Sequence, residues 1–297
     1  MKINHSLAVA FMATAFIACS QNEWPESLSD IRKPYSGQME EVNSRVTLDD
    51  SHMIHWEMGD RLSIFPGCDL NNLYQVVQIT DERGIFEFVS GGNQEYNDLD
   101  AHYAVYPYHS GTSVSNKVIT TQLPAETVYS GKENSVRHAL MTAKSDNTSF
   151  TFTNAMGILR LKLNAKQPFM IGKVQKIQLM SKTKGLCGTV TIDYSDDQQV
   201  PSAVIEATED NKTLTLNLVE SLRNDLVNDR DGNYTEFYIP MAPETYEAND
   251  LLLVITGSRN VYSKYIGCEV DIERKKIFTL AHTISAQSYE GGIENPN

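Results

Sequence analysis

Cysteine is scarce in this chain of 297 residues, and the four that occur exclude two kinds of site. Cys19, Cys68, Cys187 and Cys268 stand far apart, and no two of them form a Cys-x-x-Cys pair. Pairs at that spacing are typical of structural zinc and dithiol redox sites, so we predict neither. Three cysteines follow Cys19, an odd number that cannot form a complete disulfide framework. Cys187 and Cys268 both fall in expected strands, and a disulfide between them stays open.

Long hydrophobic runs and basic charge are also in short supply. After Cys19 no apolar stretch approaches the roughly 20 residues that a membrane helix needs, so we expect this part of the chain in water. The formal net charge is −13, and Lys2 is the only charged side chain before Cys19. A protein that binds nucleic acid needs a basic patch, so this balance argues against nucleic-acid partners.

Motifs for catalysis and for metal binding are missing as well. The chain has no Gly-x-Ser-x-Gly, no His-Glu-x-x-His and no glycine-rich phosphate loop. His52 and His55 stand near Glu57, but the pattern there predicts strand and turn, where residues three apart face opposite sides. We therefore expect no metal site, no cofactor and no enzymatic activity.

What the sequence does contain is a succession of short alternating strands separated by polar turns. This rhythm predicts an all-β fold with two antiparallel β-sandwich domains in series, at 45–165 and 166–297. A polar stretch at 19–44, with Pro25, Pro34 and Gly37, is interpreted as a tether. The expected strands include segments at 46–48, 61–65, 73–79, 84–89, 101–108, 139–143, 150–152, 157–163, 174–179, 188–193, 213–218, 236–240, 251–256 and 261–266.

Residues 1–18 have the features of an export signal. Lys2 precedes an apolar run from Leu7 to Ala18 that is too short to span a bilayer. The run ends in Phe-Ile-Ala followed by Cys19, which resembles the lipobox of bacterial lipoproteins. The resemblance implies that cleavage makes Cys19 the first mature residue, and that Cys19 carries the acyl chains that anchor the protein. An ordinary secretory signal with an incidental cysteine is the alternative.

Several segments, in order, resemble the fimbrillin-like lipoproteins of Bacteroidetes. Trp-Glu-Met-Gly-Asp-Arg-Leu-Ser-Ile-Phe at 56–65 comes first, and Tyr-Ala-Val-Tyr-Pro-Tyr at 103–108 follows. Leu-Met-Thr-Ala stands at 140–143, and Phe-Tyr-Ile-Pro-Met-Ala-Pro-Glu-Thr-Tyr stands at 237–246. The resemblance covers roughly 45–285, and its order is more specific than any single segment.

This resemblance implies a structural protein with two transthyretin-like β-sandwich domains, lipid-anchored at the surface of the outer membrane. In several family members a protease cuts after an arginine near the first strand, and a strand of a neighbouring subunit fills the groove that opens. Arg45 is the candidate for that cut and Arg32 an alternative. The partners would be other fimbrial subunits, and this chain would be a stalk or an anchor subunit.

Two points stay open at this stage. Residues 276–280 are a candidate for the donated strand or an ordinary core strand. The alternative function is a monomeric surface lipoprotein that binds host protein or glycan, and exposed aromatic residues in 93–108 would favour it.

Overall fold

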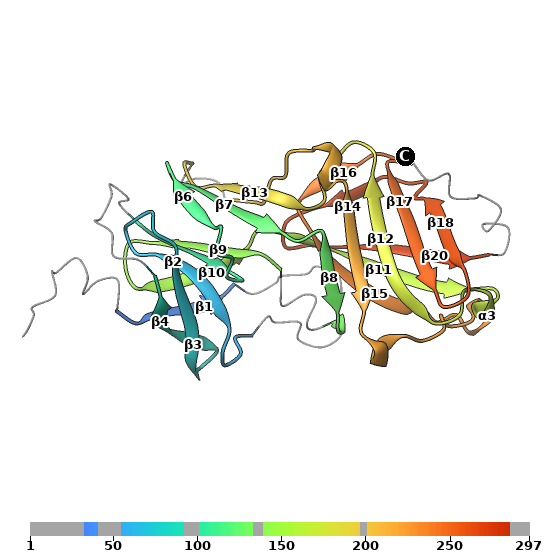
Figure 1. The fold of residues 1–297 in the computed structure, drawn as a ribbon, viewed down its shortest axis with the longest axis horizontal. Coiled ribbons are helices and arrows are strands. Elements are labelled where there is room, and N and C mark those ends of the chain that lie inside the picture. Colours follow the sequence, from blue (N-terminus) through green and yellow to red (C-terminus); the bar gives the residue numbers. More distant parts are fainter. Residues whose placement is uncertain (1–32, 41–54, 92–100, 133–138, 197–200, 286–297) are drawn as a thin grey trace, which may run out of the picture.

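The structure is a computed structural model that describes residues 33–40, 55–91, 101–132, 139–196 and 201–285. Strands dominate it, which confirms the all-β prediction, and they form an elongated molecule with two lobes (Figure 1). No helix within the described ranges is long and apolar enough to cross a membrane. The short helical turns are α3 (Pro168–Ile171), η1 (Glu209–Asn211), η2 (Glu220–Leu222) and η3 (Asp229–Asp231).

The first lobe is built on a sheet that closes on itself, which we call the closed sheet. Its interior is rich in aromatic rings, and Trp56 packs edge-on against Phe86 and Phe152 with ring centroids 5.0 and 5.1 Å apart. Such rings bury large apolar areas, and they stabilise the lobe. The strand order is β1 (Tyr35–Met39), β10 (Ser149–Asn154), β9 (Met141–Ser145), β5 (His102–Tyr106), β2 (Arg61–Phe65), β3 (Asn72–Thr80) and β4 (Arg83–Ser90), which pairs back to β1.

A small sheet covers one outer side of the closed sheet. It consists of β13 (Gly188–Asp193), β7 (Val118–Leu123) and β6 (Ser113–Ser115). Strand β5 is therefore buried on both faces: Ala104 and Tyr106 belong to the interior cluster, while Tyr103 and Val105 belong to the cluster beneath the small sheet. Burial on both faces explains why this strand is a continuous apolar run.

The second lobe consists of two sheets packed around one core. Leu159, Leu161 and Leu163 alternate along β11 and pack in this core with residues of the opposite sheet, such as Ile177 and Leu253. One sheet has the order β15 (Thr235–Met241), β11 (Gly157–Ala165) and β20 (Ile277–Ile284). The other has the order β18 (Val261–Tyr265), β17 (Leu251–Gly257), β12 (Val174–Ser181), β14 (Thr213–Leu218) and β8 (Glu126–Tyr129). A two-stranded ribbon of β16 (Glu244–Tyr246) and β19 (Val270–Ile272) completes the lobe.

Strand pairing divides the chain differently from the expected boundary at residue 165. Strand β11, expected to end the first domain, pairs with β15 and β20 in the second lobe. Strand β8 pairs with β14 there, while β13 crosses back to pair with β7. Among the strands that the structure describes, three pairings are parallel: β1 with β10, β11 with β20, and β14 with β8. Periodicity predicts which face of a strand is buried but not its partner, which explains the difference.

The expected tether also needs correction. Residues 35–39 within it form strand β1, and Tyr35 at its start is only 1% exposed. The sequence of 19–44 did not predict this strand. The inward residues of β1 are one tyrosine, one glycine and one methionine, and these do not form an alternating apolar pattern.

Candidate functional site

Strand β1 is a short strand held between two partners that come from elsewhere in the chain. It runs parallel to β10, with Gly37 opposite Phe150, and antiparallel to β4, with Gly37 opposite Gly84. The main chain continues this pairing at both ends: the Ser36 N–H donates to the Thr148 carbonyl over 2.9 Å, and the Glu40 N–H to the Phe152 carbonyl over 2.8 Å. Removing β1 would therefore open the closed sheet between β10 and β4.

The inward side of β1 is fitted to the aromatic interior. Tyr35 stacks on Phe150 with ring centroids 5.4 Å apart, and its hydroxyl lies 2.8 Å from Nδ1 of His102. A Cβ atom added to Gly37 would lie 2.7 Å from a ring carbon of Phe152 and 2.9 Å from ring carbons of Phe86. The aromatic ring at position 35 and the missing side chain at position 37 are thus both required by the packing.

The outward side of β1 is bound by one arginine of β4. The Arg83 guanidinium donates to Ser36 Oγ over 3.3 Å and to Gln38 Oε1 over 3.0 Å. It also donates to Ser149 Oγ of β10 over 2.8 Å. Arg83 therefore spans β1 and ties it to both of its neighbours.

Just after β1, Glu40 connects the first lobe to the second. One carboxylate oxygen lies 3.7 Å from Nη1 of Arg274, and the other forms an ion pair with Lys275. Arg274 also donates to the main-chain carbonyl of Asn154 over 2.9 Å, at the point where the chain passes from β10 toward β11. Both cations belong to the turn between β19 and β20, so Glu40 holds β1 against the junction of the lobes.

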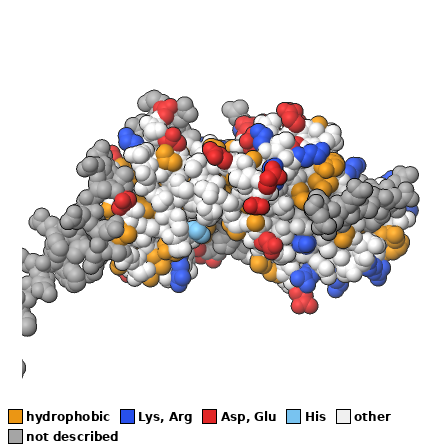
Figure 2. All heavy atoms as spheres, turned by 45° about the horizontal axis from the view of Figure 1, so that its top comes forward, with side chains coloured by type: hydrophobic (Ala, Val, Ile, Leu, Met, Phe, Trp, Pro, Cys, Tyr) orange, Lys and Arg blue, Asp and Glu red, His pale blue; other side chains and the backbone are white. Residues whose placement is uncertain are grey.

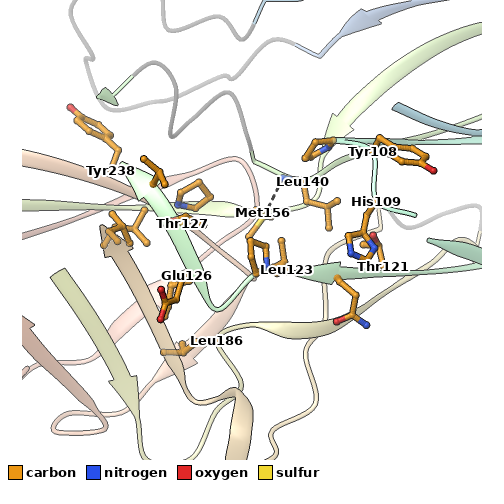
Figure 3. A pocket seen from close by; sticks show the side chains of 18 residues that line it. Tyr108, His109, Thr121, Leu123, Glu126, Thr127, Leu140, Met156, Leu186 and Tyr238 are labelled. Carbon is orange, nitrogen blue, oxygen red and sulfur yellow. Dashed lines mark hydrogen bonds between the residues drawn. The ribbon is translucent and has the colours of Figure 1, made fainter. Parts of the chain in front are cut away.

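A cavity of about 740 Å³ lies between the lobes and is lined mostly by apolar side chains. Figure 3 shows Tyr238 and Thr127 on one side of it, Tyr108 and His109 on the other, and Met156 between them. Burial, and next its hydrogen bond to Glu236, raise the pKa of Tyr238, which keeps this phenol protonated. The cavity offers an apolar volume with a few hydrogen-bonding groups at its rim, as ligand sites commonly do.

The predicted modification sites fall outside the described residues. Cys19 and Arg45 lie in 1–32 and 41–54, so lipidation and cleavage stay predictions. His52 lies there too, and within the described ranges no cluster of three or more His, Cys, Asp or Glu side chains could hold a metal ion.

The remaining cysteines are free thiols. Cys68 and Cys187 are buried, and Cys268 is exposed. The disulfide between Cys187 and Cys268 that the sequence left open is therefore absent. Burial raises the pKa of the Cys187 thiol, which also lies 3.4 Å from the Asn211 carbonyl.

The structure also shows where the candidate donor segment and two of the aromatic residues in 93–108 lie. Residues 277–280 of the candidate donor segment belong to β20, which pairs with β11 along eight residues of the second lobe. Tyr103 and Tyr106 are 1% exposed, so neither presents an aromatic surface to a ligand.

On the face shown in Figure 2, acidic and basic side chains are interspersed over both lobes.

Comparison with known proteins places the fold. No protein-family model and no curated protein matches the chain. A "putative cell adhesion protein" of Bacteroides ovatus superimposes with a TM-score of 0.51 at 17% identity, covering 85% of this chain and 92% of that one. One of Bacteroides uniformis has a TM-score of 0.47 at 14% identity, covering 86% and 94%. A "fimbrial protein" of Bacteroides ovatus has a TM-score of 0.31 at 13% identity, covering 86% and 50%. The first similarity shows a common fold over nearly the whole chain.

Proposed function

We propose that this chain is a structural subunit of a cell-surface fimbria, a stalk or an anchor, which joins neighbouring fimbrial subunits by exchanging β-strands and supports adhesion. The observation that carries the proposal is the fold shared with the Bacteroides ovatus "putative cell adhesion protein" over 92% of that chain. The resemblance to the fimbrillin-like lipoproteins, which rests on separate segments of the sequence, points the same way.

Strand β1 is the element that maturation would remove. It spans Tyr35–Met39, so a cut after Arg45 would detach it from the rest of the chain, whereas a cut after Arg32 would not. This favours Arg45 over Arg32 as the processing site. The space left between β10 and β4 would present unpaired backbone donors and acceptors, which an incoming strand can satisfy.

The anchor is the lipidated Cys19, which would hold the protein at the surface of the outer membrane. Several acyl chains give stable attachment where one alone is marginal. Cys19→Ala should move the protein from the membrane fraction to the soluble fraction. Cys268→Ala, which changes an exposed cysteine elsewhere, should leave the protein in the membrane fraction. A Cys19→Ala protein that stays with the membrane would refute the anchor.

Assembly is tested by electrophoresis of surface material, boiled beside unboiled. Strand-exchanged subunits separate slowly because main-chain pairing and side-chain burial must be lost together. We expect a ladder that collapses on boiling, lost in Arg45→Ala and kept in Arg32→Ala. A monomer band in every lane would refute the polymer. A ladder of Arg45→Ala protein with the native mature N-terminus would refute only the processing step.

The cavity supports a second candidate function, that of a monomeric surface lipoprotein that binds host protein or glycan. Tyr108, which lines the cavity and is only partly buried, is the aromatic group that such a site would use. Under this function Tyr108→Ala should abolish adhesion to host material without changing the gel pattern, and unchanged adhesion would argue against it.

A further inference from the structure

Strand β1 shows what its position in the closed sheet demands of any strand that occupies it. Position 35 holds an aromatic ring beside His102, and position 37 has room only for glycine. Position 40 holds a carboxylate between two cations. The combined requirement is an aromatic residue, then glycine two positions later, then an acidic residue three positions after the glycine.

The acidic position matters most for recognition. The side chains of Arg274 and Lys275 are only 20% and 17% exposed. If Glu40 leaves with β1, two neighbouring positive charges stay partly shielded from water with no carboxylate between them, an arrangement that a new carboxylate would relieve. The vacated position is therefore selective for an acidic strand.

Only one other segment of the chain fits this requirement. Of the 17 glycines, Gly291 alone shares with Gly37 an aromatic residue two positions before it and an acidic residue three positions after it. The segment is Tyr-Glu-Gly-Gly-Ile-Glu at 289–294, beyond the described residues. It also places Glu290 at the position of Ser36, beside the Arg83 guanidinium. In contrast, 276–280 contains no glycine.

We propose that Arg274 and Lys275 are specificity-determining residues of the strand-exchange site, and that they bind Glu294 of a second copy of this chain. Segment 289–294 then takes the place of β1, with Tyr289 at the position of Tyr35 and Gly291 at that of Gly37. The inference rests on the proposed function, and it adds the chemistry by which the incoming strand is chosen.

The geometry requires a second copy. Strand β20 begins at the lobe junction, with Ile277 opposite Ile158, and ends at Ile284 opposite Ala165, so it runs away from the first lobe (Figure 1). From Ile284 to Tyr289 an extended chain reaches at most about 18 Å, whereas β20 alone measures about 23 Å. The segment cannot return to its own closed sheet. A head-to-tail contact of this kind builds an open filament.

The test measures the fraction of chain in the boiling-sensitive ladder. Glu294→Lys should lower this fraction at least about tenfold, because it places a third positive charge beside two partly buried ones. Asn295→Lys, the matched control, should leave the ladder intact. The double variant Arg274→Glu with Lys275→Glu should also lower this fraction. Combining both changes with Glu294→Lys should restore the fraction to within about threefold of the wild-type value.

The outcomes separate this inference from the proposed function. A wild-type chain without a ladder overturns both. A ladder that is equal in wild type, Glu294→Lys and Asn295→Lys overturns the inference alone, as does a combined variant that folds by its Tm but stays monomeric. If the double variant does not fold, the comparison of Glu294→Lys with Asn295→Lys decides by itself.

Discussion

Trp56 donates its indole N–H to the main-chain carbonyl of Gly37 over 2.9 Å, and this bond ties strand β1 to the aromatic interior of the closed sheet. Trp56 is 3% exposed, so neither group can turn to water instead. A short strand with small and polar residues is thereby held by a large residue of a different segment. The stability of the closed sheet and the retention of β1 should therefore depend on the same contact.

Trp56→Phe tests this contact. The change keeps an aromatic ring but removes the donor, which leaves the Gly37 carbonyl buried without this partner and opens space beside Phe86. We expect the free energy of unfolding to fall by about 1–3 kcal/mol. Urea denaturation of the full chain measures it, and an unchanged midpoint at unchanged slope would show that the bond does not hold β1.

Gly37→Ala tests the close packing of β1. Its Cβ would lie 2.7 Å from Phe152 and 2.9 Å from Phe86, both inside the closed sheet, so rings or backbone must shift. Overpacking of this kind costs about 1–3 kcal/mol, which a lower Tm would report. Gly267→Ala is the matched control, since an added Cβ there meets nothing within 4 Å. Equal Tm values for the two variants would contradict the packing argument.

Local pattern was enough to predict many strands but not their partners. Strands were expected at 251–256 and 261–266, and they form the hairpin of β17 and β18, because the two strands are close in sequence and alternate clearly. The pairing of β13 with β7 joins residues about 70 positions apart, such as Thr189 and Gln122, and no local pattern encodes it. The same limit explains the displaced domain boundary.

The candidate site shows the same division. Cys19 could be proposed from sequence because its flanking residues resemble a lipobox, and Arg45 because the resemblance to the fimbrillin-like lipoproteins implies a cut after an arginine near the first strand. The contact of Glu40 with Arg274 and Lys275 joins positions more than 230 residues apart, and nothing near Glu40 marks it. Gly37 stood out only as a residue typical of a linker, whereas the aromatic rings around it show why glycine is needed there.

Thiol labelling tests the separation of Cys187 and Cys268. Cys268 is exposed and should react with a maleimide in the native protein, while Cys187 is buried and its raised pKa disfavours the reactive thiolate. Mass spectrometry of native and unfolded chain should find Cys187 labelled only after unfolding. A disulfide would instead make the unlabelled chain lighter by two hydrogens than the fully reduced chain. It would also keep both thiols from reacting with the maleimide until a reductant is added.

His282 should make stability depend on pH. Burial, and next the positive charge of Lys264, lower the pKa of His282 below its usual value of 6.5, and its Nε2 meets the Tyr262 hydroxyl. The unfolded chain therefore takes up this proton at a higher pH than the native chain does. The contribution of His282 to stability is present above the unfolded value and is lost as pH falls from about 6.5 toward the native pKa.

Urea unfolding at pH 7.5 and at pH 5.5 measures this loss. Wild type should lose more stability between the two conditions than His282→Gln, which cannot take up the proton. Tyr262→Phe is the informative control: it removes the hydroxyl that meets His282 but leaves the histidine covered, and burial is the main cause of the lowered pKa. It should therefore lower stability at both pH values and keep the wild-type difference between them. Equal differences in wild type and His282→Gln would show that another group dominates the acid response.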